Sequence, residues 1–585
     1  MRRTGRFVLC ACAAALALQA QGDDMVLKAM RDELAHAAGL ANVNLEKPYF
    51  FSYEIEDAHA FVVQASLGGL IGVTETRFRV PYIQVRVGDY KFDDTNYVGS
   101  GLSFGSRYSL GQFPIEDSYP VLRRYLWLET DQAYKAAVES IARKRAALKN
   151  MAEAEPLADF AHAEPVKSVE AVPHATLDRA VWTEGARSLS AIFAEFPQVL
   201  GSDVEVQELT NLRRLVNSEG TEVRTSDEVF IVRVRATGQA GDGMRLRDSE
   251  VIEEAAFDRL PAKPELEKQT RRVAENIAAL SKAPVGETYN GPVLFEGEAA
   301  AQLFAELLGK NLALTRRPVN EPGRPGMFAA SELEGRQGSR VLPEWMDAVD
   351  DPTQTEWHGR RLFGSYRVDY EGVQAKPLTV VEKGELKNFF LTRQPVTGFA
   401  GSNGRARLPG AFGAWAPAAS NLFVRAGQTS SLADLKKKML EICRARNQKY
   451  GILVRKLDFP SSASVEEVRR MMAANAADGS GSHLVSQPTL IYRLYPDGRE
   501  ELIRGMRFRD LNVRSLRDIR AAADDNYVLD YLENGAPLAL MGAGRFIAET
   551  SVIAPSVLVD DVAVRKVDEE MPKLPVVPAP ALSTK

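Results

Sequence analysis

The residues best able to do chemistry are few and widely spaced. The stretch Phe295–Phe304 (FEGEAAAQLF) opens a run with helical character and sets Glu296 and Glu298 close together in sequence. Side chains two residues apart on a helix point in nearly opposite directions, so these carboxylates do not form a chelating pair. Glu298 and Glu306 share a face of the same pattern. We interpret that face as solvated.

The histidines offer no metal-binding pattern. None has a second histidine four residues away, and none has a neighbouring Glu-x-x partner. The six are His36, His59, His162, His174, His358 and His483. We therefore predict solvent-facing or hydrogen-bonded side chains rather than ligands at these positions.

Nucleophile candidates are equally sparse. Cys443 lies on the apolar side of a helical pattern, which predicts a buried structural thiol. Ser480 and His483 form the nearest Ser/His pair, within GSGSH. A Gly-Ser repeat is typical of a flexible loop, and no strand-turn-helix context for a nucleophile surrounds it.

The chain as a whole reads as a multidomain globular protein. Its 585 residues exceed what one hydrophobic core can organise, and 45% of them are apolar. With 73 basic and 78 acidic residues it carries no positive excess for binding a phosphate backbone, so nucleic acid is not an expected partner.

Residues 1–20 (MRRTGRFVLCACAAALALQA) have the form of an export signal: a basic head, a short apolar run and small residues at the end. We expect ordinary cleavage, with lipidation of Cys12 as the less favoured alternative, and a periplasmic or extracellular location. No other segment approaches the ~20 apolar residues of a membrane helix. Cys443 is then the remaining cysteine, so an intramolecular disulfide is excluded.

The hydrophobic periodicity and the Gly- and Pro-rich stretches predict two folded domains of the α+β class. A Gly- and Pro-rich stretch, SKAPVGETYNGP, divides a mixed α+β N-terminal domain at 21–285 from a mainly antiparallel β domain at 286–567. A Pro-rich tail follows at 568–585. Residues 152–178 mix Ala, Pro and charge without a period and are predicted to be a loop or linker.

Within these domains the periodicity predicts particular elements. Helices are expected over 119–151 and 264–280, and a hairpin around Asn217–Gly220. Aromatic and β-branched runs at 76–92 and 362–372 are strand candidates.

Four stretches together resemble one protein family. In chain order they are LVNSEGTEV, GPVLFEGEAAAQLF, YEGVQAKPLTVVEKGELKNFFLTR with SNGRAR behind it, and IAPSVLVDDVAV. They resemble the TldD/PmbA proteins, also called modulators of DNA gyrase, whose active members are zinc peptidases. The resemblance spans about Met25 to Val567. It implies a two-domain TldD/PmbA-like architecture.

The resemblance also implies where a zinc site would lie. Active members carry His-Glu-x-x-x-His on the helix that begins here, with a Cys near the C-terminal end. In this sequence the motif positions hold Gly297, Glu298 and Gln302, and the corresponding late stretch, NGAPLALMGAGRF, has no thiol. Glu298 is the retained motif residue, and we predict no metal ligands and no assigned catalytic residue. This pattern resembles the PmbA/TldE branch.

The function implied is that of an exported, non-catalytic subunit of a zinc metallopeptidase complex acting on peptides or unfolded polypeptides. Its expected partner is a TldD-like catalytic subunit, which would hold the zinc, or a further copy of the chain. Two alternatives stay open: a peptidase with unrecognised ligands or a metal-independent route in which Glu298 is the general base, or an exported binding or envelope protein that has lost catalysis.

Overall fold

The computed structural model describes residues 24–42, 46–98, 113–149, 157–172, 177–320, 330–409, 414–460, 485–534, 547–568, 570–577 and 580. The predicted export signal, the Ser480/His483 pair and residues 535–546 lie outside them. In the described part, the fold is α+β with mostly antiparallel sheets, as predicted. None of the helices there is long and apolar enough to cross a bilayer.

The N-terminal half is built on one six-stranded sheet with the strand order β2-β1-β5-β6, in which β4 and β7 both pair with β6. Its strands are β1 (Pro48–Ser66), β2 (Gly69–Val87), β4 (Lys167–Val169), β5 (Val199–Asn217), β6 (Glu222–Gln239) and β7 (Arg245–Glu254). The predicted hairpin joins β5 to β6. Its turn is fixed by Asn217 Oδ1, which accepts hydrogen bonds from the backbone N–H groups of Glu219 and Thr221, both at 3.0 Å.

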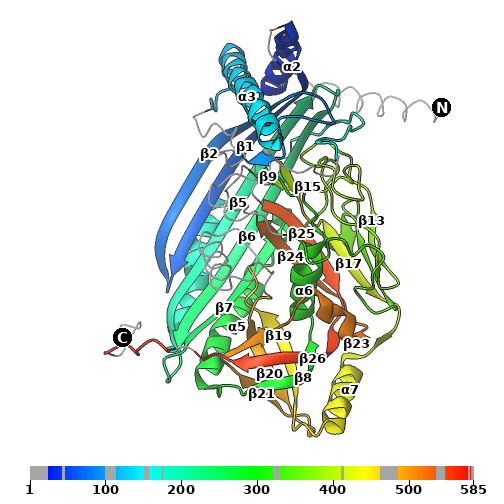
Figure 1. Ribbon diagram of the computed structural model, residues 1–585. Coiled ribbons are helices and arrows are strands. Elements are labelled where there is room, and N and C mark those ends of the chain that lie inside the picture. The colour runs from blue at the N-terminus through cyan, green and yellow to red at the C-terminus, as the bar shows by residue number, and fades with distance from the viewer. Residues whose placement is uncertain are drawn as a thin grey trace, which may run out of the picture.

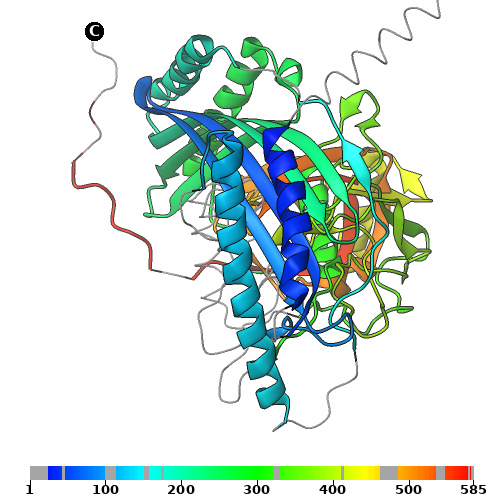
Figure 2. The same cartoon turned by 90° about the horizontal axis from the view of Figure 1, so that it is seen from above.

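Four helices cover one face of this sheet: α2 (Met25–Ala37), α3 (Tyr119–Leu148), α4 (Arg179–Ala191) and α5 (Lys263–Lys282). Helices α2 and α3 run side by side across the sheet, as Figure 2 shows. Apolar residues at helical spacing, such as Leu122, Leu126 and Ile141, pack against Tyr53 and Val85 of the strands. The predicted helices at 119–151 and 264–280 are thus confirmed, with small shifts at their ends.

The stretch 152–178, expected to be a loop or linker, is a loop over most of its described residues, with one short strand and with buried contacts that fix it in place. Residues 167–169 form β4, which pairs in parallel with the start of β6. Before it, the carboxylate of Asp159 is buried against Lys144 at 2.6 Å. The Ala161 N–H donates to the Arg393 carbonyl of the C-terminal half, and the Ala161 carbonyl accepts from the Arg393 guanidinium. Buried polar partners, which local composition does not reveal, hold this segment as a strap across the two halves.

The C-terminal half contains two larger sheets, shown at the lower right of Figure 1. The first has the order β14-β13-β10-β17-β25-β24, and the second β18-β23-β26-β8-β19-β20-β21, with β22 beside β26. Most neighbours are antiparallel, and β8–β19, β17–β25 and β18–β23 are parallel. Helix α7 (Leu432–Ala445) packs on the second sheet and buries Cys443, as predicted.

The strands of the first sheet are β10 (Met346–Asp350), β13 (Leu378–Glu382), β14 (Glu385–Leu386), β17 (Asn421–Ala426), β24 (Tyr527–Asn534) and β25 (Ile547–Ala554). Those of the second are β8 (Tyr289–Phe295), β18 (Thr429–Ser430), β19 (Gly451–Leu457), β20 (Pro488–Leu494), β21 (Glu500–Ile503), β22 (Met506–Arg509), β23 (Ile519–Ala523) and β26 (Val557–Lys566). Short pairs join β3 (Tyr97–Val98) to β9 (Val319–Asn320), β11 (Glu356–Trp357) to β12 (Arg360–Arg361), and β15 (Ala406–Pro409) to β16 (Trp415–Pro417).

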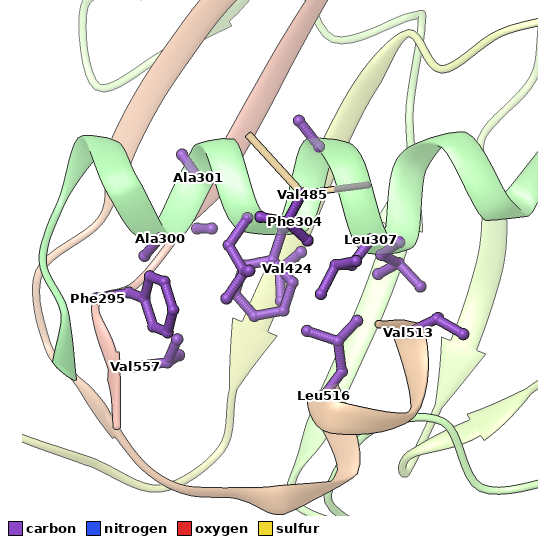
Figure 3. Packing of buried hydrophobic residues seen from close by; sticks show 14 of the residues in the cluster. Phe295, Ala300, Ala301, Phe304, Leu307, Val424, Val485, Val513, Leu516 and Val557 are labelled. Atoms are coloured by element: carbon purple, nitrogen blue, oxygen red, sulfur yellow. The ribbon is translucent and has the colours of Figure 1, made fainter. Parts of the chain in front are cut away.

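Helix α6 (Glu298–Phe304) lies between these two sheets, where it contacts β19 on one side and β24 and β25 on the other. It continues through a π-helical turn at Ala305–Gly309 and a 3₁₀ turn at Lys310–Leu312. Figure 3 shows Phe304 and Leu307 of this helix among buried side chains of both sheets. The helix is therefore buried on nearly every side, and its position is fixed by packing.

One strand expectation is wrong, and another is confirmed with a shifted end. Residues 362–372 form no strand, because the N–H groups of Phe363 and Gly364 bond to the side chains of Ser551 and Asn421 instead of to a neighbouring strand. The candidate at 76–92 ends at Val87, where Gly88 turns the chain with a φ of +101°.

The C-terminal tail, in the part described, carries no helix or strand. Its Pro572 carbonyl accepts a hydrogen bond from Gln239 Nε2 at 3.1 Å. The proposed domain bounds at 285/286 and 567/568 stay predictions.

Candidate functional site

The first turn of α6 is set by an unusual backbone. Gly297 caps the helix with φ +48° and ψ −109°, a conformation that residues with a Cβ rarely adopt. Its N–H donates to the Ser556 hydroxyl at 2.7 Å, which in turn donates to Asp525 at 2.7 Å. A glycine with a positive φ therefore fixes the junction between β8 and α6.

The side chain of Gln302 is bonded at both ends inside the fold. Its Nε2 donates to Glu298 Oε1 at 2.8 Å, one turn earlier, and its Oε1 accepts from the N–H of Leu457 on β19 at 2.8 Å. The residue is buried, at 3% exposure. Gln302 therefore links α6 to β19 and orients Glu298.

Glu298 and Gln302 line a cavity of about 310 Å³ between the two halves of the chain. One wall is the edge of β7 with which no strand of the described ranges pairs, the opposite wall is β24, and the floor is α6 with the end of β19. The lining residues are Ser249–Glu254, Pro261, Gln269, Glu298, Gln302, Arg360, Lys456, Leu457, Phe459 and Tyr527–Asp530. The cavity is rich in carboxylates, because Glu250, Glu253, Glu254, Glu298 and Asp530 all belong to it.

Lys456 is the central cation of this site. Its ammonium, on a side chain that is 9% exposed, lies 3.2 Å from Asp248 Oδ1 and 3.3 Å from Glu250 Oε2, and it donates to the Ser249 carbonyl. Burial alone would lower the pKa of Lys456, but the surrounding carboxylates outweigh burial and raise that pKa. Lys456 therefore stays charged and ties β19 to the edge of β7.

Two carboxyl groups of the cavity titrate near neutrality. Burial raises the pKa of Glu298 to about 7; the Lys456 ammonium opposes the rise, and Glu250 and Asp248 add to it. Burial, and then the charge of Asp530, raises the pKa of Glu254 to about 7 as well. Both groups can hold or release a proton at physiological pH, which is the property a general acid or base requires.

A second cavity of about 200 Å³ adjoins the first and shares Ser249, Lys456 and Leu457 with it. Its remaining lining comes from β5, β6, β7 and β20 and from Asp458 after β19; Arg235 pairs with Asp203, and Arg247 pairs with Asp458. The contact of Lys456 with Ser249 therefore helps to separate the 310 Å³ cavity from the 200 Å³ cavity.

The other glutamates of the sequence analysis lie away from this site. Glu296 points toward Arg455, at 2.6 Å, and Lys436, at 3.0 Å, which agrees with the prediction that it does not chelate together with Glu298. The interpretation of Glu298 and Glu306 as a solvated face is wrong. Glu306 is 3% exposed and accepts hydrogen bonds from the N–H and hydroxyl of Ser486, because the π-helical turn that carries it is covered by the sheets.

The described histidines do not meet. His36 lies beside Glu33, His59 beside Glu75, and His162 beside Glu219. Over the described ranges, no group of three or more His, Cys, Asp or Glu side chains has an arrangement that could hold a metal ion.

Sequence reasoning missed most of the cavity. Lys456, Glu250, Glu254 and Asp530 come from three strands far apart in the chain and carry no local motif. The available signal was weak: a lysine followed by apolar Leu457 in a run otherwise rich in aliphatic residues.

Comparison with known proteins places this geometry in context. Residues 288–566 match the family model of the PmbA/TldA metallopeptidase C-terminal domain. Among curated proteins, a metalloprotease of Methanothermobacter thermautotrophicus is 24% identical over 196 residues, which are 34% of this chain and 40% of that protein. A metalloprotease of Archaeoglobus fulgidus is 37% identical over 81 residues, 14% of this chain and 18% of that protein. The matches therefore span less than half the length of either relative.

Solved structures match over nearly the whole chain. A protein described as a modulator of a DNA gyrase, from Thermotoga maritima, superposes with a TM-score of 0.54 at 15% identity, covering 88% of this chain and 96% of that one. TldE from Thermococcus kodakarensis gives 0.53 at 13% identity, covering 92% and 100%. At these identities the similarity establishes the fold.

Proposed function

Because the chain belongs to the TldD/PmbA metallopeptidase family, we propose that it is an exported, TldE-like subunit of a zinc metallopeptidase complex, and that a partner subunit carries out catalysis. The substrates in this proposal are peptides or unfolded polypeptides. The partner is a TldD-like, ligand-complete homologue.

The observation that carries the proposal is the state of Gln302. In the active family pattern this position supplies an imidazole to zinc, whereas here both polar ends of the side chain are bonded to Glu298 and to the Leu457 N–H. An amide held in this way serves the packing of α6 and not a metal. The glycine at the other histidine position, with its positive φ, supports the same conclusion.

The residues described around α6 do not fit a zinc ion. Catalytic zinc sites use three protein ligands, commonly imidazole, thiolate or carboxylate. Of the motif positions, Gly297 has no side chain that could bind a metal, and the amide of Gln302 is already hydrogen-bonded. Glu298 is the one carboxylate among them. We therefore derive no catalytic step through a metal on this chain and assign zinc to the partner.

In the proposal, this subunit forms one wall of the chamber in which the complex holds its polypeptide substrate. The cavity beside Glu298 is open, acidic and bordered by the free edge of β7, so it can contact a polypeptide without cleaving it. Glu298, with a pKa of about 7, is also the residue that would act as general base if the chain were a hydrolase on its own.

The test compares three samples: this chain, a ligand-complete homologue from the same host, and an equimolar mixture. Zinc is measured by elemental analysis, and cleavage by hydrolysis of an unfolded polypeptide with and without a chelator. We expect no stoichiometric zinc and no cleavage for this chain, and higher or newly specific activity for the mixture than for the homologue.

The outcomes separate the alternatives. One equivalent of zinc with chelator-sensitive cleavage by this chain alone would make it a peptidase in its own right. Chelator-resistant cleavage that is lost in Glu298→Gln would favour the metal-independent route. A mixture that behaves as the sum of its parts would favour a binding or envelope role, and isolation from the native host would then identify the bound partner.

A further inference from the structure

The carboxyl group of Glu298 faces the cavity of about 310 Å³ with a hydrogen bond and without an ion pair. Its Oε1 accepts from Gln302 Nε2 at 2.8 Å. Within the described ranges, no basic side chain forms an ion pair with either of its oxygens. The second oxygen, Oε2, is therefore available to a cationic group that enters the cavity.

The cations that act on Glu298 are already balanced by other carboxylates. Lys456 pairs with Asp248 at 3.2 Å and with Glu250 at 3.3 Å. Arg272 pairs with Glu250 at 3.1 Å. Because these two cations and two carboxylates cancel, an ionised Glu298 leaves one negative charge in excess at this end of the cavity. One further cation would complete the balance.

A tyrosine ring borders the same carboxyl group. Tyr527, at the start of β24, lines the cavity and is 36% exposed. A Cβ added at Gly297, the residue before Glu298, would lie 3.6 Å from Cδ2 of this ring. Burial, and then the charges of Glu298 and Glu250, hold the pKa of the Tyr527 hydroxyl above its usual range. The ring is thus neutral, and its electron-rich face favours a cation.

The cavity also offers an apolar wall to a long side chain. Val251, Leu457 and Phe459 are among its lining residues, and its volume of about 310 Å³ lies at the small end of ligand-binding pockets. Such a space suits one side chain better than a folded domain. Lysine and arginine lay an aliphatic stem along apolar surface and carry their charge at the far end. This shape matches an apolar wall that ends at a carboxylate.

We propose that Glu298 and Tyr527 form a binding subsite for a lysine or arginine side chain of the polypeptide substrate. The cationic end pairs with Glu298 Oε2 beside the Tyr527 ring, and the stem lies along Val251 and Phe459. The identity of this ligand rests on the proposed function, which brings a polypeptide to the cavity. In this role Glu298 selects the substrate.

Binding at this subsite depends on pH with a defined sign. Burial raises the pKa of Glu298 to about 7, whereas a lysine ammonium stays charged up to about pH 10. The cation pairs with the ionised form of Glu298, so binding strengthens as the pH rises through 7. The charged and titratable groups that face Glu298 from the elements packed around it are Lys456 of β19, Asp248 and Glu250 of β7, Arg272 of α5 and Tyr527 of β24.

The test uses two blocked peptides of about nine residues, built of glycine and serine with lysine or norleucine at the centre. They differ in a single charge. Saturation-transfer difference NMR with the full chain measures their affinities at pH 8 and at pH 5.5. We expect the lysine peptide to bind about tenfold or more tightly than the norleucine peptide at pH 8, and less than about threefold more tightly at pH 5.5. Equal binding at pH 8, no binding of either peptide, or a preference that does not change with pH would refute the subsite.

Two glutamine variants locate the carboxyl group. Glu298→Gln keeps an oxygen for the Gln302 hydrogen bond and removes the charge, so it should reduce the lysine preference at pH 8 to less than about threefold. Glu254→Gln is the matched control. Glu254 lines the same cavity with a pKa also raised to about 7 by burial, but it is under the influence of Arg360 and of two further arginines, Arg259 and Arg361.

The control should therefore keep the lysine preference of the parent within about threefold. Equal losses in Glu298→Gln and Glu254→Gln would overturn the assignment to Glu298. Tyr527→Phe should keep the preference and Tyr527→Leu should lower it about threefold, because only the second variant removes the ring. Equal effects of the two tyrosine variants would remove the ring from the subsite.

A third peptide separates a side-chain cation from a chain terminus. It has norleucine at the centre and a free amino terminus. If it bound as tightly as the lysine peptide, the ligand would be the terminal ammonium and the side-chain assignment would be wrong. All these measurements use the chain without a partner or zinc. A lysine preference without any effect on cleavage by the homologue would refute the proposed function alone, whereas altered cleavage without a lysine preference would refute the subsite alone.

Discussion

Gln302 Nε2 donates a hydrogen bond to Glu298 Oε1 across one turn of α6, at 2.8 Å. The resemblance noted from the sequence sets both side chains at positions of a metal-binding motif; in the structure their polar atoms bond to each other and to β19. The polar groups of this turn of the helix are therefore used up in holding α6 against β19.

The first prediction is that restoring the histidines does not restore the site. Gly297→His forces a side chain onto a backbone with φ +48°, which costs about 1–3 kcal/mol, and Gln302→His removes both hydrogen bonds of the amide. We expect the double variant to unfold at a lower urea concentration and to bind zinc substoichiometrically, as measured by elemental analysis after dialysis.

The control for this prediction is Gly297→Ala, which introduces the backbone strain without a ligand. Because an added Cβ at this position meets no atom closer than 3.6 Å, its cost reports the strain alone. If the double variant retained one tightly bound zinc at the stability of the parent, the helix would still be a functional metal scaffold.

Local sequence patterns predicted a good part of the secondary structure. The helices at 119–148 and 263–282 have apolar residues at helical spacing, and the turn at Asn217–Gly220 has the residues its geometry needs. Residues 362–372 failed for a physical reason. Their β-forming side chains were read correctly, but their backbone donors bond to Ser551 and Asn421, which lie far away in sequence.

The sequence predicted only the part of the candidate site that lies on α6. Glu298 and Gln302 were found through a resemblance, whereas Lys456 lies more than 150 residues further along the chain and the β7 edge belongs to the N-terminal sheet. Lys456 in particular has the sequence context of an ordinary strand lysine that faces solvent. Its burial results from the docking of β19 on β7, which no periodicity within either strand specifies.

The second prediction concerns this lysine. Lys456→Met leaves the carboxylates of Asp248 and Glu250 without their cation in a buried setting, which should lower the free energy of unfolding by about 3–5 kcal/mol. Lys436→Met is the matched control. Lys436 also pairs with two carboxylates, Glu296 and Glu500, but its side chain is 25% exposed.

We expect the control to lose about 1 kcal/mol or less, because solvent screens its ion pairs. Urea unfolding followed by circular dichroism at pH 7 measures both. Equal losses for the two variants would mean that Lys456 does not clamp the two halves together.

The third prediction is a pH dependence with a defined sign. The folded pKa of Glu298, about 7, lies above its ordinary value of 4.5. Between these values the folded state binds more proton than the unfolded state, so this group's contribution to stability is full below pH 4.5 and is lost as the pH rises toward 7. Glu298→Gln removes the titration and keeps an oxygen for the Gln302 hydrogen bond.

Relative to the parent, Glu298→Gln should therefore gain about 1–3 kcal/mol of stability between pH 5 and pH 8, measured by urea unfolding at several pH values. Glu385→Gln serves as the reference, because the hydrogen bond from Lys387 lowers the pKa of Glu385 and places its titration below this window. A stability difference for Glu298→Gln that is flat with pH would contradict the raised pKa.

The last prediction concerns the strap at 157–172. Arg393 is fully buried, donates from Nε to the Ala161 carbonyl at 2.9 Å, and pairs with Glu219 at 2.7 Å, so it joins the strap, the β5–β6 hairpin and the C-terminal half. Charge-assisted hydrogen bonds of this kind contribute about 1.5–3 kcal/mol, and their loss in Arg393→Ala should raise local opening of the strap about 10- to 100-fold. Trypsin should then cut after Lys167 at a correspondingly higher rate.

Arg367→Ala is the control, because Arg367 also contacts the strap, through Glu170 at 3.4 Å, but is 78% exposed. Rapid cleavage after Lys167 in the parent and the control would show that this segment is a linker after all.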